Sequence, residues 1–161
     1  MNKSTDANRD VPAKLFAPRV GQAPYKVSAT LLTFLHESPD AVLAEAETKD
    51  GSTNWRLYWL EGDVVGLVEA SAAVEGWAND TQDDVTPDIS VTMVRLSAVG
   101  DIQFDVAQTR LDQWGSGHQV TGTMIVETGV DSIRIPQQPS GTAKADQVSD
   151  FHSALLEAWR G

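Results

Sequence analysis

The segment AVLAEAETKDGSTNWRLYWLEGDVVGLVEA, residues 41–70, decides the fold expected for this chain. Within it, Trp55, Leu57 and Trp59 occupy every second position, which is the period of a β-strand that buries one face. The Asp-Gly pair at 50–51 precedes this strand and favours a tight hairpin turn, because both central turn positions require positive φ. The pattern predicts an antiparallel meander of three strands, at 41–48, 53–60 and 64–70.

Four further strands are expected beyond the meander, at 89–96, 102–108, 118–128 and 131–135, because apolar and polar residues alternate there between turn residues. The final segment, 144–159, has apolar residues spaced by three and four, which predicts an amphipathic helix. Residues 27–36 have apolar residues at helical spacing and favour a short helix, with a strand as the alternative because of their Thr and Leu content.

The charge of the chain divides into two parts. The 161 residues carry a net charge of −11. Residues 1–26 hold five basic and two acidic residues and three prolines, without an apolar period, which predicts a disordered or extended basic arm. The arm's +3 leaves −14 on residues 27–161, the expected single globular domain. A body this acidic is a poor ligand for nucleic acid or an anionic membrane surface, so we expect no nucleic-acid binding. No stretch approaches the length of a transmembrane helix, so we expect no membrane insertion.

The end of the chain carries a resemblance to a known superfamily. Ser132-Ile-Arg-Ile-Pro136 ends the last strand, and the helix Asp150-Phe-His-Ser-Ala-Leu-Leu-Glu-Ala-Trp159 has a tryptophan near its end. With seven strands before it, this strand–loop–helix resembles the pleckstrin-homology-like (PH-like) superfamily over residues 41–160. The resemblance implies a mostly antiparallel α+β fold, in which the C-terminal amphipathic helix closes a bent seven-stranded sheet or barrel. An unrelated α+β barrel or sandwich with flanking helices is the alternative.

The resemblance implies a scaffold and does not supply a ligand. Lipid-binding members of the superfamily hold phosphoinositide headgroups with Lys and Arg in the loop after the first strand. Here that loop has Lys49 beside Asp50, and Arg56 is the only other cation nearby. Two isolated cations on an acidic body make a weak headgroup site.

Two predicted loops, 71–88 and 109–117, hold the candidate binding residues. Large aromatic residues in loops either pack back as anchors or form hot spots for a partner, and we favour anchoring while keeping both readings open. Carboxylate oxygens are typical calcium ligands, so the acidic residues raise the possibility of a calcium site. Their spacing departs from the EF-hand pattern, however, and we therefore expect a solvated surface. The candidate binding residues are Trp77, Asp80, Asp83, Asp84, Asp88 and Trp114.

No catalytic or metal-binding motif is recognisable. The chain has no cysteine, and His36, His118 and His152 lie more than 30 residues apart, so neither a thiolate site nor a local histidine motif exists. Phosphate-binding glycine motifs and a nucleophile elbow are absent from the sequence. We therefore expect no catalytic residues, no metal site and no cofactor.

These observations favour a non-catalytic protein-interaction module whose acidic body recruits a basic protein partner, for example as an inhibitor or immunity protein. Without cysteine or an apolar leader, a cytoplasmic location is expected. A small-ligand-binding barrel, or an enzyme whose site the fold assembles, is the alternative. Homo-oligomer formation is a third possibility, through exchange of the N-terminal arm or through a strand edge.

Overall fold

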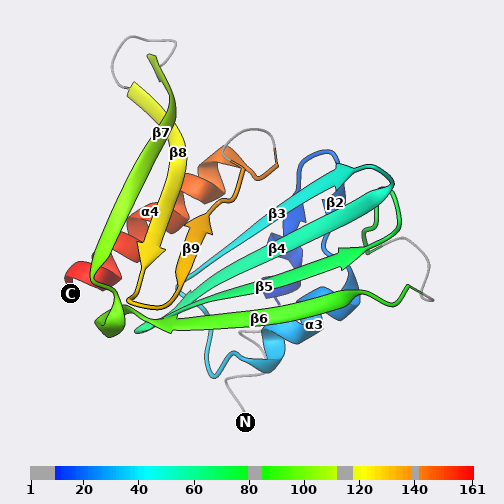
Figure 1. The fold of residues 1–161 in the computed structure, drawn as a ribbon, viewed down its shortest axis with the longest axis horizontal. Coiled ribbons are helices and arrows are strands. Elements are labelled where there is room, and N and C mark those ends of the chain that lie inside the picture. Colours follow the sequence, from blue (N-terminus) through cyan, green and yellow to red (C-terminus); the bar gives the residue numbers. More distant parts are fainter. Residues whose placement is uncertain (1–9, 80–84, 112–117, 139–141) are drawn as a thin grey trace.

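The chain folds into an α+β structure with nine strands in three antiparallel sheets, in a computed structural model that describes residues 10–79, 85–111, 118–138 and 142–161 (Figure 1). The strands are β1 (Phe16–Ala17), β2 (Gly21–Gln22), β3 (Ala41–Lys49), β4 (Ser52–Glu61), β5 (Val64–Ala72), β6 (Asp88–Arg95), β7 (Asp101–Leu111), β8 (His118–Glu127) and β9 (Ser132–Ile135). The helices are α2 (Val11–Lys14), α3 (Tyr25–Thr33), the 3-10 turn η1 (Leu96–Ala98) and α4 (Ala145–Arg160).

The meander forms most of a four-stranded sheet with the order β3-β4-β5-β6. Asp50 and Gly51 both have positive φ, 53° and 77°, as the hairpin prediction requires. The register is continuous from Lys49↔Ser52 through all three strand pairs, so residues two apart along each strand share one face.

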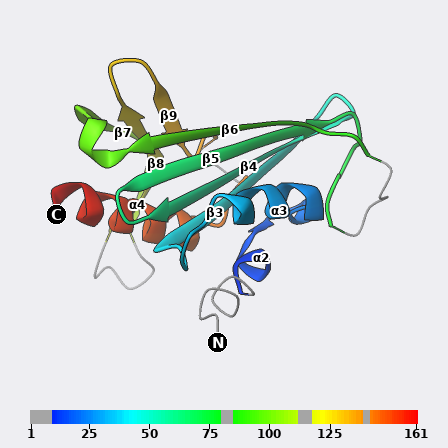
Figure 2. The ribbon, with the colours of Figure 1, turned by 90° about the horizontal axis from the view of Figure 1, so that it is seen from below.

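Both faces of the four-stranded sheet are buried over much of their area, and each face has its own hydrophobic core. On one face, which we call the α3 face, Trp55, Leu57 and Trp59 pack with Val27 and Leu31 of α3. On the other, the α4 face, residues such as Tyr58 and Leu67 pack with the helix α4 and the second large sheet (residues Leu43, Tyr58, Leu60, Val65, Leu67, Met124, Ile135, Phe151 and Leu155). Figure 2 shows α3 lying along its face of the sheet, with α4 on the other side. The predicted burial of Trp55 and Trp59 and both predicted helices are confirmed.

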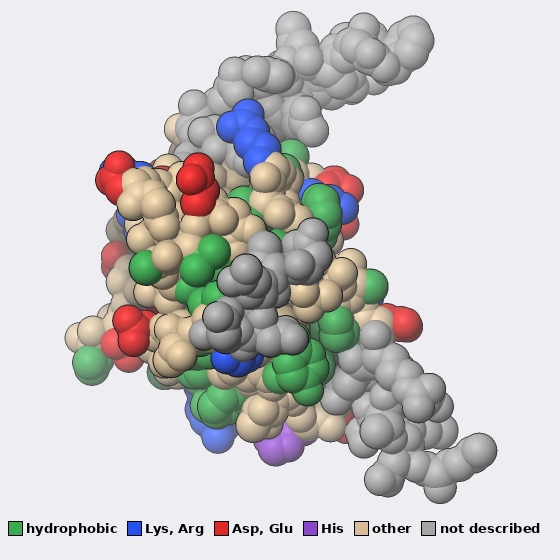
Figure 3. All heavy atoms as spheres, turned by 90° about the vertical axis from the view of Figure 1, so that its right-hand side faces the viewer, with side chains coloured by type: hydrophobic (Ala, Val, Ile, Leu, Met, Phe, Trp, Pro, Cys, Tyr) green, Lys and Arg blue, Asp and Glu red, His purple; other side chains and the backbone are tan. Residues whose placement is uncertain are grey.

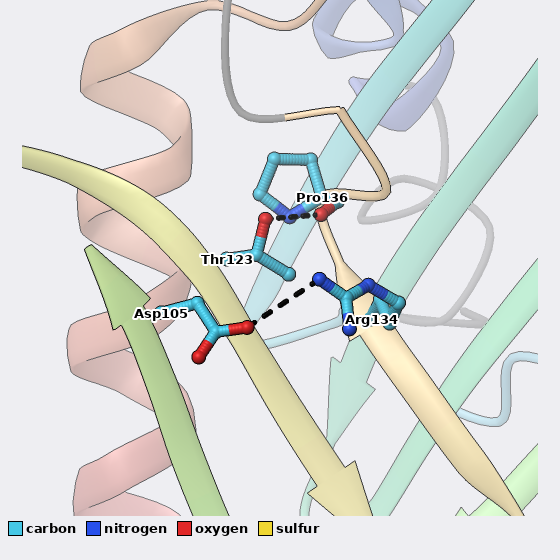
Figure 4. A network of polar contacts seen from close by, with 4 residues as sticks. All are labelled: Asp105, Thr123, Arg134 and Pro136. Atoms are coloured by element: carbon cyan, nitrogen blue, oxygen red, sulfur yellow. Dashed lines mark hydrogen bonds and ion pairs between the residues drawn. The ribbon is translucent and has the colours of Figure 1, made fainter. Parts of the chain in front are cut away.

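The second large sheet has the order β7-β8-β9 and is tied together by side chains. Thr123 of β8 donates to the carbonyl of Pro136, just after β9, at 2.9 Å. Arg134 of β9 forms an ion pair with Asp105 of β7 at 3.6 Å, across the middle strand (Figure 4). These contacts join all three strands and hold Asp105 at the outer side of the sheet.

The strands form separate sheets because η1 breaks the chain between β6 and β7. The backbone N–H of Leu96 donates to the carbonyl of Asp63, and that of Ser97 donates to the Asp63 carboxylate. These bonds hold η1 against the β4–β5 turn, and β7 then begins a new sheet. Nine strands in three sheets thus replace the expected single seven-stranded sheet, and the described residues form no closed barrel.

The structure also differs from the predicted arm over residues 10–26, while residues 1–9 lie outside the described part. Leu15 and Ala17 are fully buried and join the core on the α3 face, and the Ala23 N–H donates to the Leu15 carbonyl at 2.8 Å. This segment lacks a sequence period because its few apolar residues cover an existing core and form no amphipathic element of their own.

A buried carboxylate, Glu45, closes the outer edge of β3. It accepts hydrogen bonds from the Tyr58 hydroxyl at 2.9 Å, the backbone N–H groups of Gln137 and Gln138 at 2.9 and 2.6 Å, and the Thr142 hydroxyl at 3.1 Å. Burial, followed by the negative charge of Glu45, raises the pKa of Tyr58 well above its ordinary value, so this hydroxyl remains a donor. The Ala46 N–H also donates to the Thr142 carbonyl, so the segment after β9 occupies this edge.

Candidate interaction surface

Trp77, one of the candidate binding residues, is a buried anchor and does not form part of an exposed surface. Its side chain is 3% exposed and belongs to the core on the α3 face. Its carbonyl accepts from Trp55 Nε1 at 2.7 Å, and its N–H donates to Thr53 Oγ1 at 3.1 Å. Tertiary contacts therefore pull this loop residue inward, in agreement with the anchoring reading.

The other candidates divide into one described residue and four that lie outside the described part of the chain. Asp88 is the first residue of β6, and its side chain is exposed. The predicted loop therefore ends at a strand, and Asp88 belongs to a sheet edge. The four candidates that lie outside the described residues are Asp80, Asp83, Asp84 and Trp114.

The edges of the two large sheets differ in how they are protected against pairing with another chain. The edge at β3 is occupied by the segment held by Glu45. β9 is only four residues long. β7 begins with Asp101, carries the ion-paired Asp105, and has an irregular register between Val106 and Gln108. Covering segments, short strands, charges and bulges are the devices that block edge-to-edge pairing.

Among the residues that the structure describes, the β6 edge has none of these devices within its length. Within the described ranges, β6 pairs with β5 alone, in continuous register over eight residues, and Figure 1 shows it as the last strand of its sheet. Charges occur only at its two ends, Asp88 and Arg95, and it contains neither proline nor glycine. Its side chains on the α3 face are partly exposed, with Ile89 at 37% and Met93 at 51%. A long edge with these properties is a site where an extended chain can pair.

An apolar groove lies beside β6 on the α3 face. It has a volume of about 370 Å³ and is lined by residues that follow the end of α3 and by residues of three strands (Phe34, His36, Trp59, Glu61, Val64, Met93, Val94 and Arg95). Phe34 stacks on the Trp59 ring, with 6.4 Å between ring centroids. The groove is therefore walled by Phe34 on one side and by the exposed Met93 on the other, directly beside the open edge.

The α4 face of the sheet becomes polar where the second core ends. Glu45, Arg56, Glu69 and Ser90 are opposite one another on the four strands and form one transverse row. Part of this row lines a polar hollow of about 280 Å³ together with the next row toward the sheet end (lining residues Asn54, Trp55, Arg56, Glu69, Ala70, Ser71, Asp88, Ile89 and Ser90). The edge of β6 thus has an apolar groove on one face and a polar hollow on the other.

Three charged side chains of the polar hollow lack a partner among the described residues. Glu69 and Asp88 are exposed, and neither side chain forms a hydrogen bond or ion pair with any residue of the described chain. Arg56 Nη1 is buried, and it too has no hydrogen-bond partner among the described residues. In Figure 3, which faces the end of the sheet beyond this hollow, the positive and negative side chains of the described residues lie dispersed among hydrophobic ones.

His152 lies in the interior and forms no part of this surface. His152 is buried, donates through Nε2 to the Ile135 carbonyl at 2.7 Å, and contacts the Phe104 ring edge to face. Burial lowers its pKa, and the bond to Ile135 opposes that shift. Within the ranges that the structure describes, no group of three or more His, Asp or Glu side chains could hold a metal ion. In the same ranges, no helix combines the length and apolar character needed to cross a membrane.

Comparison with other proteins does not add a functional assignment. No family model matches the chain, and neither the curated proteins nor the solved structures include a significant match.

Proposed function

We propose that this chain is a non-catalytic, cytoplasmic protein-interaction module on a PH-like scaffold, and that β6 receives an extended segment of a protein partner as an additional strand. The observation that carries this proposal is the open β6 edge, which is long and uncharged between its ends. Unpaired N–H and C=O groups along such an edge supply main-chain hydrogen bonds to an added strand.

The groove supports strand addition because it lies next to the bonds that the added strand would form. Side chains of an added strand alternate between the two faces of the sheet, so every second side chain lies on the α3 face beside Ile89 and Met93. Burial of apolar surface there contributes about 25 cal/mol per Å². Backbone bonds alone give little sequence preference, and the groove supplies it.

The arrangement of the large sheets supports the PH-like part of the proposal. Four antiparallel strands are followed by three more and then by a helix packed between the two sheets' apolar faces. This is the element order that the resemblance implies for residues 41–160. The net charge of −11 supports a basic partner, and an inhibitor or immunity protein is one kind of module that fits this chemistry.

The proposal is tested by titrating the ¹⁵N-labelled full chain with an uncharged probe, an acetylated and amidated heptapeptide of alternating Val and Thr. We expect chemical-shift changes at residues 88–95. The double variant Ile89→Lys/Met93→Lys should abolish them, because lysines along an edge oppose pairing. The matched control is Phe104→Lys/Val106→Lys on β7, where the side chains are 41% and 57% exposed, and it should leave binding unchanged. Shift changes confined to β7, or none at millimolar peptide, would refute strand addition at β6.

Arg56 favours a second candidate function, the binding of a small acidic ligand in the polar hollow. Its buried Nη1, which has no hydrogen-bond partner among the described residues, would donate a charge-assisted hydrogen bond to a carboxylate. Titration with acetate and succinate, compared between the wild-type chain and Arg56→Gln, tests this function. Saturable shift changes at Asn54 and Ser71 that disappear in the variant would support it, and their absence would exclude it.

A further inference from the structure

The two faces of the sheet beside β6 differ in chemistry, and an added strand would meet both. In β6, Ile89, Val91 and Met93 lie on the α3 face, while Asp88, Ser90, Thr92 and Val94 lie on the α4 face. Antiparallel or parallel, an added strand presents successive side chains to opposite faces. Its sequence should therefore alternate in character.

The α3 face selects apolar side chains. Ile89 and Met93 are four residues apart, with the partly buried Val91 between them, so they form an apolar row about 13 Å long at about 3.3 Å per residue. A partner strand opposite this row places three side chains, at positions i, i+2 and i+4, against it. Apolar side chains at those positions would cover the exposed surface of Ile89 and Met93 and reach the groove.

The α4 face selects basic side chains near the first half of β6. Asp88 lies on the strand next to an added strand, and Glu69 lies one strand further in, so their backbones are about 5 and 10 Å from it. Both distances are within reach of a Lys or Arg side chain that meets a carboxylate side chain. Neither carboxylate has a partner within the described chain, so no hydrogen bond or ion pair within it has to break when a basic side chain of the added strand binds.

Arg56 does not make the α4 face select acidic side chains, because it lies far from the backbone of an added strand. It lies on β4, and therefore about 15 Å from the backbone of an added strand, with Glu69 directly between them. A negatively charged side chain on the added strand would meet Asp88 and Glu69 before it could reach Arg56. Like charges at neighbouring positions of paired strands oppose pairing.

We infer that the β6 edge recognises an extended protein segment with a particular alternation of side chains, an inference that rests on the proposed function. Apolar residues at alternate positions of this segment lie on the α3 face, and a Lys or Arg between them lies beside Asp88 and Glu69. The occupant is thus a strand whose side chains on the α3 face are apolar and whose side chain opposite Ser90, on the α4 face, is basic. The acidic character of the chain then acts through two particular carboxylates at the end of the sheet.

The experiment compares three acetylated and amidated heptapeptides, which alternate Val with Lys, Val with Thr, and Val with Glu, for binding to the full chain. We expect the Lys peptide to bind about tenfold more tightly than the Thr peptide in low salt, with the Glu peptide weakest, because two exposed ion pairs each contribute a few-fold at most. Glu69→Gln/Asp88→Asn should remove the advantage of the Lys peptide and leave the Thr peptide unaffected. The matched control is Glu47→Gln/Asp150→Asn, which removes the same charge from β3 and α4, away from the β6 edge, and should preserve the advantage.

The outcomes separate the inference from the proposed function. Equal binding of the Lys and Thr peptides at β6 would overturn the basic–apolar pattern while strand addition stands. Tighter binding of the Glu peptide would overturn the pattern and indicate that acidic side chains of the peptide pair with Arg56. Failure of all three peptides to bind at β6 would overturn the proposed function itself. If the chain alone sediments as a dimer that Ile89→Lys/Met93→Lys converts to a monomer, the occupant is a second copy and the inferred partner is wrong.

Discussion

The indole ring of Trp59 occupies the space above Gly66, so that a Cβ at Gly66 would lie 2.1 Å from Trp59 Cζ2. Gly66 is paired with Trp59 on β4 and with Met93 on β6, and all three lie on the α3 face. The ring can therefore lie across β5, between Phe34 and the open edge, because position 66 has no side chain. The wall of the apolar groove depends on this glycine.

Substitution of Gly66 by Ala should destabilise the fold. The added methyl group meets the Trp59 ring and the surrounding core rather than a flexible side-chain end, and overpacking of this kind costs about 1–3 kcal/mol. Urea denaturation measures the loss. Gly100→Ala is the control, because a Cβ there meets nothing within 4 Å. Equal stability of the two variants would show that Trp59 does not fill this space.

Substitution of Glu45 by Ala should cost about 3 kcal/mol or more, because it leaves several buried or partly buried donors without an acceptor at about 1–3 kcal/mol each. The free energy of unfolding gives the size of the effect, and hydrogen exchange at the Ala46 amide reports whether the edge of β3 opens. Glu47→Ala, two residues along the same strand, is the matched control. A stable Glu45→Ala variant with a protected Ala46 amide would contradict the role given to Glu45.

The stability of the chain should fall as the pH drops below about 6.5, the ordinary pKa of histidine. Burial lowers the pKa of His152 in the folded state, so the unfolded state takes up the proton first. The stability contribution is complete above the unfolded pKa and is lost as the pH falls through the lower folded value. His152→Gln keeps a donor for the Ile135 carbonyl and should flatten this dependence. Urea titrations at several pH values between 5 and 8 decide the matter, and an unchanged slope in His152→Gln would assign the effect to another group.

Trp77 should behave as a core residue in a mutational test. Trp77→Ala removes a buried side chain and is expected to cost about 3–5 kcal/mol of stability. Tyr25→Ala, at a side chain that is 77% exposed, should cost little. If Trp77→Ala retained full stability, the loop would not be anchored through this side chain.

Local sequence patterns predict most of the secondary structure of this fold. The strands at 41–48, 53–60, 64–70 and 131–135 match β3, β4, β5 and β9 within two residues, because their side-chain period and turn residues are local properties. The helix at 144–159 matches α4 within one residue for the same reason. The buried segment around Leu15 was not predictable in this way, because its contacts are with strands far along the chain.

The candidate surface could be predicted only in part. Asp88 was found from the acidic composition around it, but its place on an edge strand depends on the strand order, which is not a local property. The alternation of Ile89, Val91 and Met93 correctly predicts one shared face, and their partial exposure follows from α3 covering the central strands more completely than the edge. The hydrogen-bond donors to Glu45 were not predictable either. Three of the four lie more than 90 residues away from it in the sequence, so no local pattern indicates them.

Amide hydrogen exchange along β6 tests strand addition most directly. In the free chain, amides of β6 that point away from β5 lack a strand partner, so residues 89–94 should alternate between fast and slow exchange. When the alternating Val–Lys peptide is added at saturating concentration, the fast amides should slow by at least about tenfold, the change expected for a newly formed ladder that is open less than a tenth of the time. The Ile89→Lys/Met93→Lys variant should show no such slowing. Bound peptide with unchanged exchange along β6, or protection that appears on β7 instead, would contradict strand addition at this edge.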